Sequence, residues 1–186
     1  MQVSIQTKHL QVRNFNENDW PYLFEYTKLP QVMRYITSGT QTIGEAMKFV
    51  HQNIEGKPKA FAIVLQETNL LIGHITFNPY NGEHTYELGW IIHPEFQNRG
   101  YATEAVKAFM LHVFRYLKTH RLIAICPVEN IASWRVMEKI GMRKEAHYRK
   151  SLPYGEHDWL DEYMYAILRA DLQDKLQFPY KATFKS

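Results

Sequence analysis

A short segment near the middle of the chain has the residue types that bind phosphate groups through the protein backbone. The apolar run Gly89-Trp90-Ile91-Ile92 predicts the end of a strand, and the periodicity that starts at Ala102 predicts a long helix. The segment Gln97-Asn98-Arg99-Gly100-Tyr101-Ala102-Thr103 joins them, with Gly100 for close backbone approach and Arg99 for a charged contact at the rim. Because free amides at a helix N-terminus carry the positive end of the helix dipole, this segment is suited to binding a diphosphate. Taken in isolation, Gly100 and Ala102 are better explained by a tight strand-to-helix turn alone.

The elements that must position this segment follow from hydrophobic periodicity. Seven strands are predicted, at residues 10–15, 60–66, 70–77, 85–92, 122–126, 143–150 and 161–168. Short turns join the second, third and fourth of these strands, which favours an antiparallel meander. Helices are predicted at residues 16–28, 42–54, 102–117 and 130–141, with the first two on one side of the meander. The fold class is therefore α+β with a mixed sheet.

Composition and charge narrow the class of protein. The chain has 186 residues, of which 45% are hydrophobic, and no segment resembles a linker, so a single domain is expected. The formal net charge is only +3, without a basic-aromatic platform, which argues against a nucleic-acid partner. No apolar run approaches the ~20 residues of a membrane span, so a cytoplasmic protein without a membrane partner is expected. Cys126 lies in an apolar run and is predicted to be a buried, unreactive thiol.

Two segments resemble a known superfamily. Residues 87–105 are similar to the central motif of the GCN5-related N-acetyltransferase (GNAT) superfamily, whose Gln/Arg-x-x-Gly-x-Gly/Ala signature is matched by Gln97, Gly100 and Ala102. Residues 129–142 are similar to the Asn-x-x-Ser segment of the RimJ/RimL-like branch, which acetylates the N-termini of ribosomal proteins. The resemblance implies one GNAT domain over residues 1–186, with a core at about 8–172 and a tail at 173–186. It also implies a mixed, mostly antiparallel sheet of about seven strands, with splayed central strands and flanking helices.

The resemblance implies acetyl-CoA as the acyl donor and assigns residues to it. Trp90, Ile91 and Ile92 are expected beside the pantetheine arm, and the segment from Gln97 to Thr103 is expected to hold the diphosphate. Asn130 and Ser133 match family positions that contact the cofactor near its sulfur. From the residues alone, the better explanation is structural, with Asn130 as a helix N-cap and Ser133 as a polar residue of the first helical turn.

Acyl transfer to an amine needs a neutral nucleophile, a donor to the oxyanion and a proton for the departing thiolate. Ser133 is the predicted proton donor, because the branch that it resembles carries serine at this position. A backbone amide near Ile91 is the predicted oxyanion donor. Glu87 shares a strand face with Gly89 and Ile91, so it is either a general base that acts through water or a structural carboxylate of the strand.

The identity of the amine acceptor is left open by these residues. A protein N-terminal amine of the ribosomal-protein type is expected, and the alternative acceptors are an aminoglycoside or a polyamine. A different alternative is that the protein is a non-catalytic sensor of acyl-CoA. Segment 28–42 is expected to form the loop on the acceptor side. His84, His93 and His157 are dispersed along the sequence, so no metal site is predicted. Whether the chain forms a homodimer is left open.

Overall fold

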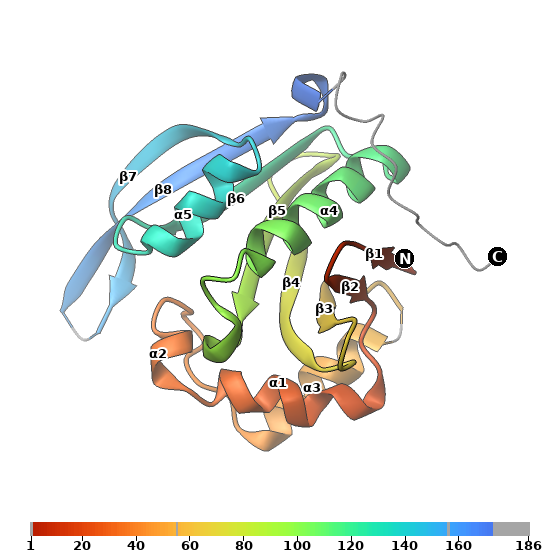
Figure 1. Ribbon diagram of the computed structural model, residues 1–186. Helices are drawn as coiled ribbons and strands as arrows, with labels where there is room; N and C mark the ends of the chain where they lie inside the picture. The colour runs from red at the N-terminus through yellow and green to blue at the C-terminus, as the bar shows by residue number, and fades with distance from the viewer. Residues whose placement is uncertain (1, 55, 156, 173–186) are drawn as a thin grey trace.

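Eight strands form one sheet, in the order β1-β2-β3-β4-β5-β6-β8-β7 (Figure 1). The computed structural model describes residues 2–54, 56–155 and 157–172, so the predicted tail lies outside the described residues. Every neighbouring pair is antiparallel except β5 and β6, which are parallel. The strands are β1 (Ser4–Gln6), β2 (Leu10–Arg13), β3 (Ala60–Leu65), β4 (Leu71–Pro79), β5 (Thr85–Ile92), β6 (Arg121–Pro127), β7 (Arg143–Tyr154) and β8 (Asp158–Leu168).

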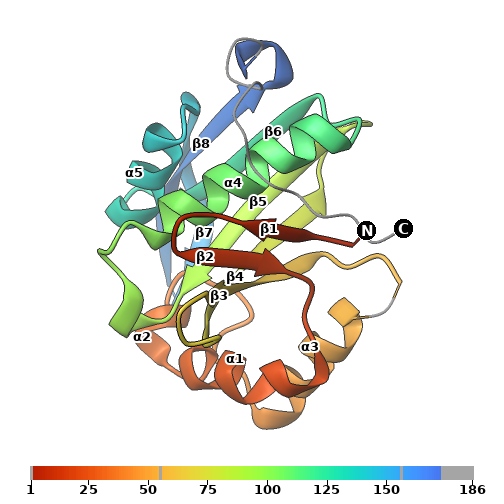
Figure 2. The same ribbon diagram turned by 45° about the vertical axis from the view of Figure 1, so that its right-hand side comes forward.

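Helices cover both faces of this sheet. Figures 1 and 2 show α4 and α5 on one face, with α1 and α3 on the other. The α-helices are α1 (Trp20–Thr27), α2 (Pro30–Met33), α3 (Ile43–Ile54), α4 (Tyr101–Tyr116) and α5 (Ile131–Lys139). Three 3₁₀ turns complete the described elements, namely η1 (Glu17–Asp19), η2 (Pro94–Phe96) and η3 (Arg169–Leu172).

The alternation of side chains along the strands divides the core into two clusters. On β3, Phe61 and Ile63 pack in the cluster beneath α4 and α5, whereas Ala62 and Val64 pack in the cluster with α1 and α3. Successive side chains of a strand point to opposite faces of the sheet. A strand whose two faces are both covered therefore has a continuous run of apolar residues in its sequence. The placement of the first two predicted helices on one side of the meander is confirmed by the second cluster.

The parallel pair at the centre of the sheet separates partway along its length. β5 and β6 are paired only at Thr85, Tyr86 and Glu87 of β5, although β5 continues to Ile92. Beyond Glu87, the backbone groups of β5 that face β6 therefore have no partner in the described sheet. Backbone N–H and C=O groups require hydrogen bonds, so this gap can accept a ligand that carries amide groups. The predicted splay of the central strands is confirmed.

One carboxylate fixes the start of α4 to the turn between β1 and β2 at the edge of the sheet. Glu104 accepts hydrogen bonds from the Thr7 hydroxyl at 2.6 Å and from the His9 amide at 2.8 Å, and it also pairs with His9 Nδ1 at 2.8 Å. Although burial opposes the charge, these hydrogen bonds lower the pKa of Glu104 below its usual value. The negative charge also favours the first turn of a helix. The end of α4 that faces the gap is thereby held rigidly.

Candidate active site

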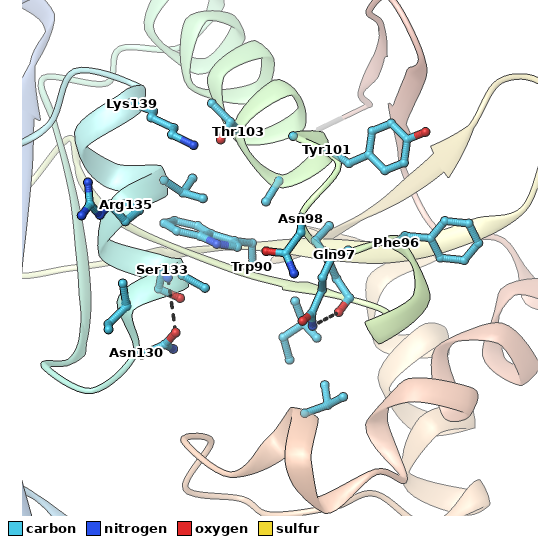
Figure 3. A pocket seen from close by; sticks show the side chains of 18 of the residues that line it. Trp90, Phe96, Gln97, Asn98, Tyr101, Thr103, Asn130, Ser133, Arg135 and Lys139 are labelled. Carbon is cyan, nitrogen blue, oxygen red and sulfur yellow. Dashed lines mark hydrogen bonds between the residues drawn. The ribbon is translucent and has the colours of Figure 1, made fainter.

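A cavity of about 760 Å³ opens between the last residues of β5, the start of α4 and one face of α5 (Figure 3). All but one of the residues predicted to bind the cofactor line it. These are Trp90, Ile91, Ile92, Gln97, Asn98, Gly100, Tyr101, Ala102, Thr103, Asn130 and Ser133. The structure therefore brings together two segments that lie some thirty residues apart in the sequence.

The turn into α4 leaves backbone donors free beside the cavity. Asn98 and Gly100 have positive φ values of 60° and 83°, a region that asparagine and glycine tolerate best. Gly100 is the N-cap and provides no side-chain cap, and the first bond of the helix runs from Glu104 N–H to Gly100 C=O at 3.0 Å. The N–H groups of Tyr101, Ala102 and Thr103 therefore have no partner within the helix. Such a helix start is suited to binding an anion.

Two residues of the predicted phosphate segment have local roles in the structure. The Gln97 side chain lines the cavity, and its Nε2 donates to the Ile92 carbonyl at 2.9 Å, which closes the turn after β5. Arg99 is the predicted residue that does not line the cavity. It is exposed, and its guanidinium carbon lies 5.6 Å from the centre of the Phe96 ring.

The first turn of α5 combines a cap with a free hydroxyl. Asn130 is the N-cap, and its side chain accepts a hydrogen bond from the Ser133 backbone N–H at 3.3 Å (Figure 3). The capping role expected for Asn130 from its position is thus confirmed. Among the described residues, the Ser133 hydroxyl has no hydrogen-bond partner. It faces the same cavity as the free amides of α4 and is available to a ligand.

Comparison with known proteins decides the family. A model of the acetyltransferase (GNAT) domain matches residues 9–143. The uncharacterized N-acetyltransferase YnaD of Bacillus subtilis is 46% identical over 167 residues, which are 90% of this chain and 98% of YnaD. The chain belongs to the GNAT acetyltransferase family. It is an N-acetyltransferase, and the predicted GNAT fold is confirmed.

Solved structures of GNAT acetyltransferases have the same architecture. An acetyltransferase of the GNAT family from Bacillus anthracis is 45% identical and aligns with a TM-score of 0.85, over 90% of this chain and 99% of that one. RimL, a ribosomal α-N-protein acetyltransferase solved with coenzyme A, aligns with a TM-score of 0.79 over 89% of this chain and 97% of RimL. RimL is only 23% identical, so this second likeness shows the fold alone.

The cavity of this GNAT acetyltransferase fits the acyl donor of the family, acetyl-CoA. Its free helix amides suit a diphosphate, and the unpaired backbone of β5 suits the two amides of a pantetheine arm. The charged side chains among its lining residues, Arg135 and Lys139, are both positive, which suits an anionic ligand. These features belong to the described residues themselves and do not depend on the comparison with relatives.

Glu87 does not line this cavity but lies on the opposite face of β5. In the register with β4, Glu87, Gly89 and Ile91 stand opposite Asn78, Thr76 and His74, so the shared face predicted for the three β5 residues is confirmed. Ile91 packs against the cluster beneath α1 and α3, which identifies that face. Glu87 therefore points to the face of the sheet that α1 and α3 cover, at the last paired position of β5 before the gap.

Burial and a second carboxylate both raise the pKa of Glu87. Partial burial is the main cause of this rise, and the negative charge of Glu162 on β8 adds to it. Glu162 accepts a hydrogen bond from the Ser151 hydroxyl at 2.8 Å. Perturbed carboxylates often mark functional sites, and a raised pKa makes Glu87 a stronger base. Sequence analysis did not identify Glu162, because it lies 75 positions beyond Glu87 in the chain.

The lone thiol in the described chain is buried and unreactive, as predicted. Cys126 is 4% exposed, and burial, with the nearby charge of Glu162, raises its pKa to about 12. The thiolate is the reactive form, so Cys126 remains a thiol near neutral pH.

Segment 28–42 reaches the cavity. It contains the short helix α2, and its two ends are joined by a hydrogen bond from Gln41 N–H to Thr27 C=O at 3.0 Å. Val32, Tyr35 and Ile36 of this segment line the cavity. Their contribution was not predicted, because no periodic pattern marks a loop that folds back over a distant strand end.

Arg135 and Lys139 of α5 were also missed. Together with Ala132 they follow an i, i+3, i+7 spacing, which places three residues on one face of a helix and could have identified them.

The remaining expectations concern metals and membranes. In the described part of the chain, no group of three histidine, cysteine or acidic side chains is arranged to hold a metal ion. No helix of residues 2–54, 56–155 or 157–172 is long and apolar enough to cross a membrane.

Proposed function

We propose that this enzyme transfers the acetyl group of acetyl-CoA to the N-terminal amine of a protein of the ribosomal-protein type. The main support for acetyl-CoA as the acyl donor is the position of three free backbone amides beside the gap between β5 and β6. These are the amides of Tyr101, Ala102 and Thr103. The diphosphate binds these amides, and the pantetheine arm runs along Trp90, Ile91 and Ile92 toward the acceptor face.

The residues around the gap have separate roles in the acyl-transfer reaction. The amine nitrogen of the acceptor forms a bond to the thioester carbon of acetyl-CoA, and the carbon–sulfur bond breaks so that the sulfur leaves as a thiolate. Ser133 donates a proton to this sulfur, which its unpaired hydroxyl permits, and its oxygen takes up a proton from water in the same step. The backbone amide near Ile91 donates to the carbonyl oxygen as negative charge develops on it. Glu87 accepts the proton of the amine through water from the other side of the sheet.

The pKa of the acceptor favours an N-terminal amine. An α-amino group has a pKa of about 7.7–8.0, whereas a lysine-like alkylammonium has a pKa of about 10.4. The pKa of Glu87 is raised only by partial burial and by the charge of Glu162. Glu87 therefore removes a proton more readily from an α-amino group than from an alkylammonium group. The similarity of residues 129–142 to the RimJ/RimL-like branch supports the same class of acceptor.

Thiol release from acetyl-CoA tests the proposal. The enzyme is assayed with peptides that begin with serine or alanine, with the same peptides blocked at the N-terminus, and with spermidine and an aminoglycoside. Turnover is expected with the free peptides, together with loss of turnover when their N-terminus is blocked. Mass spectrometry should locate the acetyl group on the α-amine.

The other outcomes identify the rival functions. Turnover with spermidine or the aminoglycoside alone would make the enzyme a small-molecule acetyltransferase. Tight binding of acetyl-CoA without turnover on any amine would point to an acyl-CoA sensor.

A further inference from the structure

Both charged side chains that line the cavity come from one helix and have the same sign. Arg135 and Lys139 are the charged side chains among its lining residues, and no carboxylate accompanies them there. They stand four residues apart on α5, a spacing at which like charges repel each other on the helix surface. Two cations in this arrangement are best explained by an anion that both of them, or one of them, binds.

The two cations are directed differently. Figure 3 shows the ammonium group of Lys139 directed across the cavity toward Thr103 of α4, whereas the guanidinium of Arg135 is turned away from α4. The guanidinium carbon of Arg135 lies 4.9 Å from the centre of the Trp134 ring. No described acidic residue forms an ion pair with Lys139. Lys139 is therefore the cation that is free to meet a ligand in the cavity.

The position of Lys139 along α5 indicates which part of the ligand it meets. Asn130 and Ser133 lie at the start of α5, and Lys139 lies six residues after Ser133, about 9 Å farther along the helix axis. If the thioester lies at Ser133, Lys139 is at the nucleotide end. The diphosphate already has the free amides of α4 as donors. Coenzyme A carries one further phosphate, on the 3′ position of its ribose, to which a cation at the nucleotide end can form a charge-assisted hydrogen bond.

We propose that Lys139 binds the 3′-phosphate of coenzyme A and so makes the enzyme discriminate CoA from dephospho-CoA. The inference rests on the proposed function, because it takes coenzyme A as the ligand of the cavity. The ammonium of lysine is a compact point charge on a flexible stem, which suits a terminal phosphate that is mobile relative to the diphosphate.

Calorimetric titration with CoA and with dephospho-CoA tests this subsite without using activity. The unaltered enzyme should bind CoA more tightly. Lys139→Gln should weaken CoA binding about tenfold, the loss of one charge-assisted hydrogen bond, and should leave dephospho-CoA binding unchanged. Lys118→Gln removes the same charge at an exposed position two residues beyond the C-terminal end of α4 and should leave both affinities unchanged. Glutamine and lysine have similar helix propensities, so the fold of α5 should be retained.

The possible results separate the inference from the proposed function. Equal losses for both ligands would place Lys139 on the diphosphate and overturn the inference, as would an unchanged preference for CoA in Lys139→Gln. Failure of the unaltered enzyme to bind either ligand would overturn the proposed function together with the inference.

Discussion

Tyr26 of α1 stacks on His74 of β4, with ring centroids 5.8 Å apart and the tyrosine hydroxyl 2.8 Å from Nδ1 of His74. Both side chains are buried, and the rings of Phe15 and Phe49 also pack near His74, at 6.4 and 5.3 Å between centroids. This contact fixes the end of α1 to the sheet directly before segment 28–42. It thus helps to position the loop that lines the cavity.

Removal of the tyrosine hydroxyl should destabilise the protein. Tyr26→Phe keeps the ring stacking but leaves Nδ1 of buried His74 without its partner, which should lower the free energy of unfolding by about 1–3 kcal/mol. The double variant Tyr26→Phe/His74→Phe removes both polar groups and should recover most of this loss. Urea unfolding of the two variants near neutral pH measures the difference. A double variant as unstable as the single one would show that packing, and not the hydrogen bond, is the important contribution.

Acid should destabilise the protein through His74. Burial lowers the pKa of His74 to about 4, whereas a histidine in the unfolded chain has a pKa of about 6.5. Between these two values the unfolded state binds a proton that the folded state does not. The stability that comes from neutral His74 is therefore complete above about pH 6.5 and is lost progressively toward pH 4, by on the order of 3 kcal/mol. Unfolding at about pH 7 and about pH 5 should show a steeper fall for the unaltered protein than for Tyr26→Phe/His74→Phe. Equal falls would assign the acid sensitivity to other groups.

The elements that sequence analysis predicted are those with a strong and buried period. The strand Thr85–Ile92 was predicted with its observed bounds, and the long helix Tyr101–Tyr116 was predicted to within one residue at each end. One strand and one α-helix were missed because they are too short for a period to appear, namely Ser4–Gln6 and Pro30–Met33. The predicted helix at 16–28 is divided into a 3₁₀ turn and α1.

In the β7–β8 hairpin, the strand bounds could not be predicted accurately from the sequence. The strand predicted at 143–150 continues to Tyr154 in the structure. The prediction ended too early because this exposed edge strand has few apolar residues to mark its two faces. A register shift between Tyr148 and Leu152, with a positive φ of 50° at Lys150, interrupts the alternation further.

The candidate site was predicted where its residues are consecutive in the chain. The segment from Gln97 to Thr103 combines a glycine, a helix start and a preceding strand, so its function could be inferred locally. Tyr35 and Glu162 reach the site only through the packing of distant elements. Local sequence carries no information on such contacts.

Gly100→Ala should weaken CoA binding more than its effect on stability explains. A non-glycine residue at a positive φ costs about 1–2 kcal/mol. A Cβ atom at Gly100 would meet no protein atom within 4 Å, and Gly100 lines the cavity, so the added methyl group would occupy space beside the ligand. Gly82 has a φ of 94° and the same open surroundings, but it lies in the β4–β5 turn, away from the cavity. Gly82→Ala is therefore the matched control.

Thermal unfolding and calorimetric CoA titration measure the two effects of these glycine variants. The stability loss should be similar for both, whereas only Gly100→Ala should lose affinity for CoA. Unchanged affinity in Gly100→Ala would remove the diphosphate from this turn.

The charge of Glu162 should shift the pH dependence of the reaction. Because Glu87 must be ionised to act as a base, kcat/KM should rise with pH through the pKa of Glu87. Burial keeps this pKa raised, but Glu162→Gln removes the second cause, so the acidic limb should move to lower pH. Glu87→Gln should reduce kcat/KM about a hundredfold or more and remove this limb. Glu67→Gln, in the exposed β3–β4 turn, should change neither quantity. An acidic limb that survives in Glu87→Gln would assign the base to another group.

Ser133→Ala should separate proton donation from cofactor binding. The Ser133 hydroxyl has no hydrogen-bond partner among the described residues, while its backbone N–H remains bonded to the Asn130 cap in the variant. The fold and the CoA affinity should therefore be retained. A thiolate is a good leaving group, so kcat should fall only about ten- to a hundredfold, at or below the lower end for proton transfer. Asn130→Ala should instead lose about 1 kcal/mol of stability with the cap. Single-turnover rates and calorimetry distinguish these effects, because equal losses of rate and CoA affinity in Ser133→Ala would make the hydroxyl a binding group rather than an acid.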